Sequence, residues 1–479
     1  MHNIQSSNFA NSAKAVSLKP STAPGAHQRS YNNTKITQLN ICEILKELES
    51  HQGPYAQNLA GNLAGRVNSL VDKKIDNEEL ASLRAIIFNP SYLAELLPRM
   101  FPRQFANFVN SIRKIKLTPD TTIKKEILGD EVAQIIASIA TQKVATFFKY
   151  PDDAACSNLI NGLAQLGFTK RDLPELNLSN LTAILNQLTR KIPTLPFSAL
   201  EPQQIANIFN GLGKMEFQKD DLSALDLPAL SAAINHNFSK IEARTWSNLS
   251  NSLAKMKYIK EELQNLNMAE FIKAINRTLP SSNAIDLANG FGGLAKMHFN
   301  KTDLHGINIL ELEAAVNRNL ISSSSKDLSC ILNSLANLGF NRTDLANLDL
   351  LALNNSINSR LINASAQDIT MLFYSLSQLE YHLYDFHDLS IVSLIKALNR
   401  TVVDIKSSNH LNNLAKGLHR FGFNHDFFSQ LDCEVCVKLE SFGMLREKST
   451  TNNINKFEGF YLGWEQDTIE ERRLNCSLQ

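Results

Sequence analysis

Amide and cationic side chains recur at positions i, i+3 and i+7 of a segment that is repeated seven times along the chain. None of these positions holds Asp or Glu; the four exceptions to the amide or cationic type are Gly292, Cys330, Met371 and Tyr374. Asn and Gln offer a donor and an acceptor to unstacked bases, and Lys and Arg suit phosphates. We call these columns the amide–lysine stripe. Its candidate binding residues are Asn158, Asn161, Gln165, Asn207, Asn210, Lys214, Asn248, Asn251, Lys255, Asn289, Lys296, Asn333, Asn337, Gln378, Asn413, Lys416 and Arg420.

Two structural alternatives remain open for this stripe. A solvated helix face is the first, but that face would be expected to use Glu, Lys, Gln and Arg, which are better helix formers than Asn. A ladder of Asn side chains that hydrogen-bond between stacked repeats is the second, and it requires no ligand.

A small residue at the centre of the segment marks each copy of the repeat, so the period can be counted from it. The distances between successive copies are 49, 41, 41, 41, 41 and 42 residues. A degenerate copy precedes them near residues 105–111. The central residues are Gly162, Gly211, Ser252, Gly293, Ser334, Ser375 and Gly417.

Each repeat contains two helical patterns. In one copy Leu287, Gly290, Leu294 and Met297 follow the 3-4-3 spacing of an amphipathic helix. A second apolar pattern begins after a column of good N-cap residues. That column holds Asn177, Asp226, Asn267, Asn308, Asp349 and Ser390. Because one pair of helices cannot bury its apolar surface alone, we predict an all-α fold, an α-solenoid of about seven or eight two-helix repeats of about 41 residues.

Composition sets the boundaries of the array. We expect a disordered leader over 1–35, an N-terminal helical region with the degenerate repeat over 36–150, the repeat array over 151–430, and a C-terminal cap and tail over 431–479. The leader lacks Asp and Glu, so an organelle-targeting segment is an alternative for it. The insertion at 191–202 predicts a loop or bend. The net charge of +1 requires no polyanionic partner by itself, no apolar run is long enough to span a membrane, and the six cysteines are expected to be reduced thiols.

A second basic column lies in the loop between the two helices of each repeat. Acidic residues accompany it two positions later, such as Asp303 after Lys301. The basic side chains could contact phosphates alongside the stripe, or the acids could neutralise them or cap the following turn. The column comprises Lys170, Lys219, Lys260, Lys301 and Arg342.

A third column, of Asn near the end of the second helix, is expected to be structural. Arg often follows it, which suits a helix C-terminus. The column is Asn186, Asn235, Asn276, Asn317, Asn358 and Asn399.

Catalytic signatures are absent from the sequence. Cys433 and Cys436 form a CxxC without a second pair, and the glycines at 290, 292 and 293 lie inside a predicted helix rather than between a strand and a helix. We therefore predict a non-catalytic protein with no cofactor, no metal site and no small-molecule substrate.

The segment Leu287–Phe299 resembles the octotricopeptide repeat of organellar RNA-binding proteins, over roughly residues 155–425. That resemblance implies an α-solenoid whose first helices bind single-stranded RNA. The chain also looks like an uncharacterised repeat family of intracellular bacterial pathogens, and Glu465–Leu474 is similar to the acidic tails of type IV secreted effectors. The expected partner is single-stranded RNA; the alternative is a scaffold that binds a host protein or peptide, without membrane association. The corresponding location is cytoplasmic, or secreted into a host cell with organelle targeting as a further option.

Overall fold

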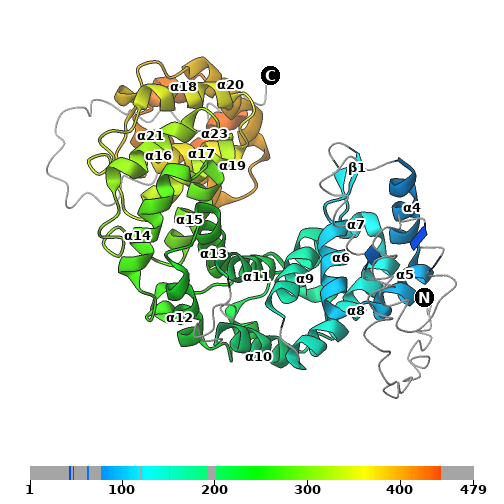
Figure 1. Ribbon diagram of the computed structural model, residues 1–479. Coiled ribbons are helices and arrows are strands. Elements are labelled where there is room, and N and C mark those ends of the chain that lie inside the picture. The colour runs from blue at the N-terminus through cyan, green and yellow to red at the C-terminus, as the bar shows by residue number, and fades with distance from the viewer. Residues whose placement is uncertain are drawn as a thin grey trace, which may run out of the picture.

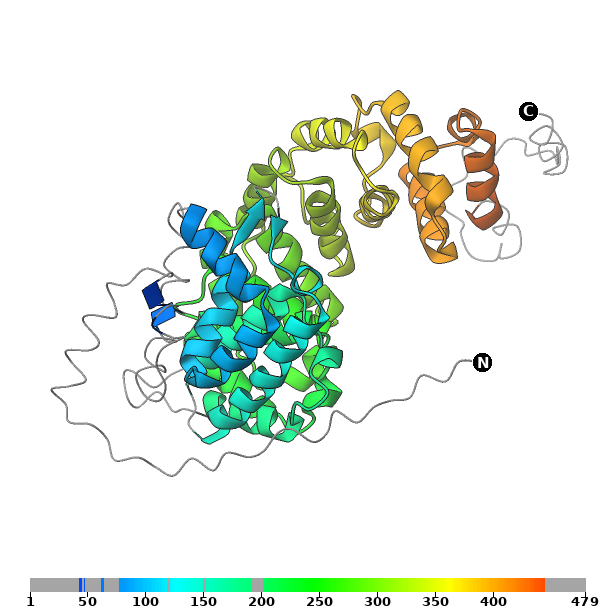
Figure 2. The same cartoon turned by 90° about the vertical axis from the view of Figure 1, so that its right-hand side faces the viewer.

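The computed structural model describes residues 43, 44, 47, 62, 63, 77–118, 121–149, 152–190 and 201–443. The predictions for the leader at 1–35, for most of the insertion at 191–202 and for the acidic tail at 465–474 lie outside these residues. The described residues form a curved array of helix pairs (Figure 1). Seen from the side, the C-terminal repeats, yellow to orange, extend beyond the N-terminal ones (Figure 2). The predicted α-solenoid is confirmed.

The first helices of the repeats carry the amide–lysine stripe. A degenerate copy at 102–112 precedes the seven clear ones, as the sequence predicted. They are α6 (Pro102–Ile112), α9 (Asp153–Leu166), α11 (Pro202–Lys214), α13 (Ala243–Lys255), α15 (Ala284–Lys296), α17 (Ser325–Asn337), α19 (Ala366–Gln378) and α21 (Ser408–Phe421).

The second helices form the other layer of the array. They are α8 (Asp130–Lys149), α10 (Leu178–Thr189), α12 (Leu227–Asn237), α14 (Met268–Thr278), α16 (Ile309–Leu320), α18 (Leu350–Leu361), α20 (Ile391–Thr401) and α23 (Cys433–Gly443). The predicted N-cap column is confirmed, because each of its side chains accepts a hydrogen bond from the backbone three residues on, as Asn267 does from Glu270.

Short elements complete the described chain. The helices α4 (Asn77–Ile87), α5 (Pro90–Arg99), α7 (Lys125–Leu128) and α22 (His425–Phe428) flank the pairs, and β1 (Lys116–Thr118) pairs antiparallel with β2 (Thr121–Thr122). Single 3-10 turns are η1 (Lys170–Asp172), η2 (Lys219–Leu222), η3 (Lys260–Leu263), η4 (Leu279–Ser281), η5 (Leu383–Asp385) and η6 (Val402–Asp404).

Small residues bring successive first helices into close contact. A Cβ at Gly293 would lie 2.4 Å from the carbonyl carbon of Ser250, and one at Gly162 would lie 2.9 Å from the backbone nitrogen of Asn110. Where the column holds serine, as at Ser334, the hydroxyl donates back to a carbonyl of its own helix. The column therefore sets the separation of the first helices.

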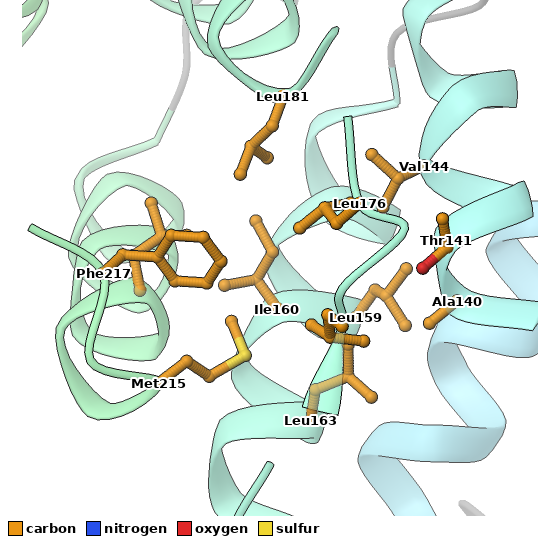
Figure 3. A pocket seen from close by; sticks show the side chains of 12 residues that line it. Ala140, Thr141, Val144, Leu159, Ile160, Leu163, Leu176, Leu181, Met215 and Phe217 are labelled. Carbon is orange, nitrogen blue, oxygen red and sulfur yellow. The ribbon is translucent and has the colours of Figure 1, made fainter. Parts of the chain in front are cut away.

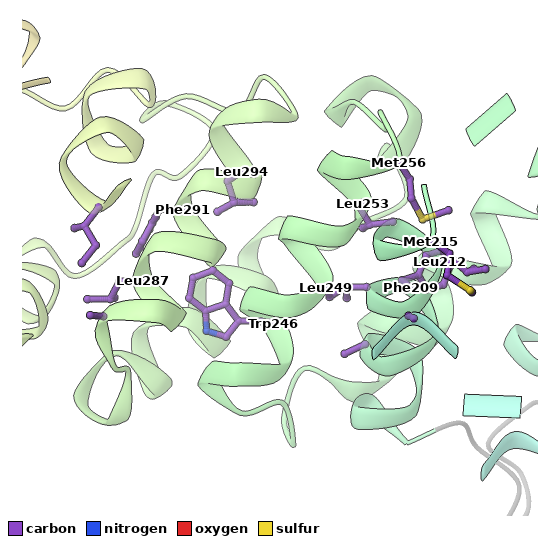
Figure 4. Packing of buried hydrophobic residues seen from close by; sticks show 14 of the residues in the cluster. Phe209, Leu212, Met215, Trp246, Leu249, Leu253, Met256, Leu287, Phe291 and Leu294 are labelled. Atoms are coloured by element: carbon purple, nitrogen blue, oxygen red, sulfur yellow. The ribbon is translucent and has the colours of Figure 1, made fainter. Parts of the chain in front are cut away.

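The core lies between the two layers and is continuous along the array (Figure 4). Trp246 is fully buried there, and its ring occupies the space that a Cβ at Gly290 would need. The indole Nε1 donates to the hydroxyl of Thr278 at 3.0 Å. The glycines of the 290–293 segment are therefore packing positions and not a phosphate-binding turn.

The third Asn column joins one repeat to the next, as expected. The Asn276 side chain donates to the Gly306 carbonyl at 2.9 Å and accepts from the Asn308 backbone at 2.9 Å. Arg318 also links two repeats: its guanidinium donates to the carbonyls of Leu279 and Pro280, just after the second helix of the preceding repeat. Equivalent paired amide contacts are made by Asn186, Asn235, Asn317 and Asn358.

Candidate functional site on the concave face

The first helices line the inside of the curve. Each of them packs along the first helix of the next repeat, whereas the second helices are spread over the outside, with α10, α12 and α14 at the outer edge of the bend (Figure 1). In a curved array the closer-spaced layer is necessarily the inner one. The amide–lysine stripe therefore belongs to the concave face.

The structure brings the three columns of the stripe together on this face, in graded exposure. From α11 to α21 the residues at i and i+3 are half-buried, apart from exposed Lys416, and those at i+7 are exposed. The exposed i+7 column comprises Lys214, Lys255, Lys296, Asn337, Gln378 and Arg420.

One exposed column of this face was missed by the sequence analysis. It lies four residues before position i, on the same side of each helix, so its signal was the i−4 spacing. It contributes two further cations, Arg244 and Lys326, and no carboxylate. Its members on α11 to α21 are Gln203, Arg244, Ile285, Lys326, Gln367 and Asn409.

The cations of the concave face repel one another. Lys214 is exposed as a whole residue, but its amine is partly desolvated by the helices around it; that desolvation, followed by the nearby charges of Lys255, Arg113, Lys124 and Arg244, lowers the pKa of Lys214. Burial, Lys296 and Lys326 likewise lower the pKa of Lys255. Burial and Arg244 lower the pKa of Arg113, at the end of α6.

No carboxylate forms an ion pair with these cations within the described part of the chain, although burial and then the nearby carboxylates of Asp327 and Asp368 raise the pKa of Cys330 in the stripe. Lys214, Arg244, Lys255, Lys296 and Lys326 take part in none of the ion pairs found there. The concave side of α11 to α17 thus carries cations that no ion pair neutralises among the described residues, although the net charge of the chain is only +1.

The second basic column is arranged differently. Lys260 Nζ lies 2.7 Å from the Asp303 carboxylate of the next repeat, and its backbone nitrogen donates to the Met297 carbonyl at 3.0 Å. We call this series of pairs the ion-pair ladder. Both structural alternatives for the acids hold: they pair with the cations, and they also cap the following turn, as Asp303 Oδ2 does by accepting from the Asn300 backbone nitrogen at 2.8 Å. This column therefore does not support phosphate binding. The pairs are Lys125–Asp172, Lys170–Asp221, Lys219–Glu262, Lys260–Asp303, Lys301–Asp344 and Arg342–Asp385.

Some stripe amides do bond between repeats, as the ladder alternative proposes. Asn158 Nδ2 donates to Asn107 Oδ1 at 3.0 Å. Asn251 Nδ2 donates to Asn289 Oδ1 at 3.3 Å. These links are intermittent: the side chains of Asn161, Asn210, Asn337, Gln378 and Asn413 make no hydrogen bond among the residues that the structure describes. Stacking between repeats therefore accounts for part of the stripe only.

Other parts of the described chain offer little for chemistry. A gap between α8, α9, α10 and α11 is lined by side chains such as Leu159, Ile160 and Leu163, and it is a packing defect in the core (Figure 3). No group of three or more His, Cys, Asp or Glu able to hold a metal ion occurs in the described ranges. Burial raises the pKa of the Cys156 thiol to about 12. The expectation that all cysteines are reduced is wrong for Cys433, which is disulfide-bonded.

No protein-family model matches the chain, and no curated protein does. Among the helices that the structure describes, none combines the length and the apolar character needed to cross a membrane.

Proposed function

We propose that this protein binds single-stranded RNA along its concave face. The observation that carries the proposal is the set of cations on α11 to α17: five of them on neighbouring helices form no ion pair among the described residues, while the ladder cations of the same repeats are all paired. Such a surface is stabilised when phosphates neutralise it.

The amides supply the second part of the argument. Side chains such as Asn161, Asn210 and Asn337 combine a donor and an acceptor and lack partners within the described chain. They belong to the same stripe as the cations, and Asn210 lies about one turn before Lys214 on α11. Unpaired bases expose edges that such amides can recognise, whereas a duplex hides them. The combination favours a single strand over a duplex.

The test is fluorescence anisotropy of the purified full chain with a labelled random-sequence RNA at several salt concentrations. Duplex DNA of the same length is the control. If the cations of the stripe itself contact phosphates, the log–log salt slope should be about −3.5, and it should approach about −5 if Arg244 and Lys326 contribute as well. The cations of the stripe are Lys214, Lys255, Lys296, Lys416 and Arg420. Binding to an acidic peptide pool but not to RNA would assign the same face to a protein partner, and absence of RNA binding at low salt would contradict the proposal.

A protein-binding role on the other face is a second candidate, because aliphatic side chains are exposed there on consecutive second helices. Leu310 and Ile321 on and after α16 are 68% and 82% exposed, and Leu351 and Ile362 repeat them at α18. Residues 11 apart are three helical turns apart and lie on the same side of a helix. Each of these second helices therefore presents one aliphatic side chain near its start and one at its end, and from repeat to repeat these side chains form two rows on the convex face. Exposed apolar patches of this kind mark protein interaction sites.

A further inference from the structure

An aromatic ring interrupts the amide–lysine stripe on α19. Tyr374 occupies the i+3 column, where Asn333 stands on α17 and Lys416 on α21. It is half-buried, and Met371 precedes it by one helical turn on the same face. Across the stripe columns of all the described first helices, no other position holds an aromatic residue. Of the four stripe positions that are neither amide nor cationic, Tyr374 is therefore the aromatic one.

The backbone of Tyr374 is held from two sides. On one side α21 approaches so closely that a Cβ at Gly417 would lie 2.7 Å from the Tyr374 nitrogen. On the other side the hydroxyl of Ser375 donates to Asn333 Oδ1 on α17 at 3.3 Å. The hydroxyl of Ser377 also donates to the Tyr374 carbonyl, at 2.7 Å. An aromatic side chain on such a fixed backbone loses little entropy when it receives a ligand.

The charge of the concave face is interrupted at the same place. The cations of α11 to α17 end at Lys326, and the next ones on this face are Lys416 and Arg420 on α21. The stripe residues between them are uncharged. An RNA strand that follows the concave face must therefore pass the region between Lys326 and Lys416 without a stripe cation to bind its phosphates. It needs another type of contact there. The uncharged residues are Cys330, Asn333, Asn337, Met371, Tyr374 and Gln378.

We propose that Tyr374 is a stacking platform for one unpaired base of the bound RNA, placed between two segments that contact phosphates. The inference rests on the proposed function and deepens it. Base stacking on an aromatic side chain is independent of salt and tolerant of sequence. The site therefore combines phosphate contacts, amide contacts and one stacked base.

Two substitutions and one control test this platform in the full chain with the same labelled RNA. Tyr374→Asn introduces the residue that the column holds on α17, so folding should be preserved, which circular dichroism checks. It should weaken binding about 5- to 150-fold and leave the salt slope unchanged. Tyr374→Phe should bind as the wild type does. The control is Tyr384→Ala, because Tyr384 is exposed in η5, off the stripe, where it stacks on His382 with ring centroids 5.2 Å apart.

A spectroscopic measurement separates stacking from a general loss of structure. RNAs with 2-aminopurine at one position each should show one position whose fluorescence is quenched by the wild type and by Tyr374→Phe, but not by Tyr374→Asn. Wild-type affinity in Tyr374→Asn, or an equal loss in Tyr384→Ala, would overturn the platform and leave RNA binding intact. Failure of the wild type to bind any RNA would overturn both proposals.

Discussion

The two basic columns of the repeat are close in sequence and opposite in character. Lys255 of the stripe and Lys260 of the ladder are five residues apart in the sequence, and both columns recur with the same period. Lys260 is paired with Asp303, whereas Lys255 has like charges around it and no carboxylate partner in the described residues. A regular column of cations is therefore not by itself a sign of a polyanionic ligand; its neutralisation by the next repeat must be known.

Reversing charge on the stripe should have the largest effect. Replacing Lys214, Lys255 and Lys296 with Glu removes three phosphate contacts and adds repulsion. We expect a loss of RNA affinity of at least about 100-fold and a salt slope less steep by about 2. Anisotropy measures both. Thermal unfolding should show little loss of stability, because no ion pair is broken; a large drop in the melting temperature would instead mean that these lysines are structural.

Reversing one charge on the ladder should give the converse result. Lys260→Glu places a carboxylate beside Asp303, where the present ion pair has side chains only about one quarter exposed, at 26% and 27%. The free energy of unfolding should fall by about 1–2 kcal/mol, from the lost pair together with the new repulsion. Urea denaturation measures this change. RNA affinity should stay within about threefold of the wild type, and a loss comparable to that of the stripe variant would erase the distinction between the columns.

Neutralising a single stripe lysine should have the smallest effect, and its sign is diagnostic. The pKa of Lys255 is lower in the folded chain than in the unfolded chain, so the protonated lysine destabilises the fold. This destabilisation is fully present at any pH below the folded pKa. Lys255→Gln should therefore raise the free energy of unfolding at pH 7, by less than about 1 kcal/mol. The gain should shrink as the pH rises through the folded pKa toward the unfolded value of about 10.4. Lys260→Gln is the matched control and should be destabilising at pH 7; equal signs for the two variants would contradict the comparison.

Much of the fold was predictable because its determinants are local. The 3-4-3 apolar spacing of residues 287–297 identified the first helices, and cap residues such as Asn267 located the start of the second. The disulfide-bonded state of Cys433 was predicted wrongly, because a CxxC spacing alone does not determine whether its cysteines are oxidised.

The candidate site was predictable in part. The stripe residues do share the concave face, since positions i, i+3 and i+7 lie on one side of any helix. Arg244 and Lys326 were missed because the repeats were aligned from position i of the stripe onwards, and these two residues lie four positions before it. The role of the third Asn column was anticipated, but its partners, such as Gly306 and Asn308 for Asn276, were not.

The sequence by itself determined the repeat, its two helices and the faces on which the amides and cations lie, because these follow from periodicity within about 40 residues. Only the tertiary structure decided which cations are free to bind. Lys260 meets Asp303 43 residues further on, across a repeat boundary, and Lys255 is surrounded by Lys296 and Lys326 from two further repeats. Electrostatic energies depend on distances in space, and the stacking of helix pairs fixes those distances.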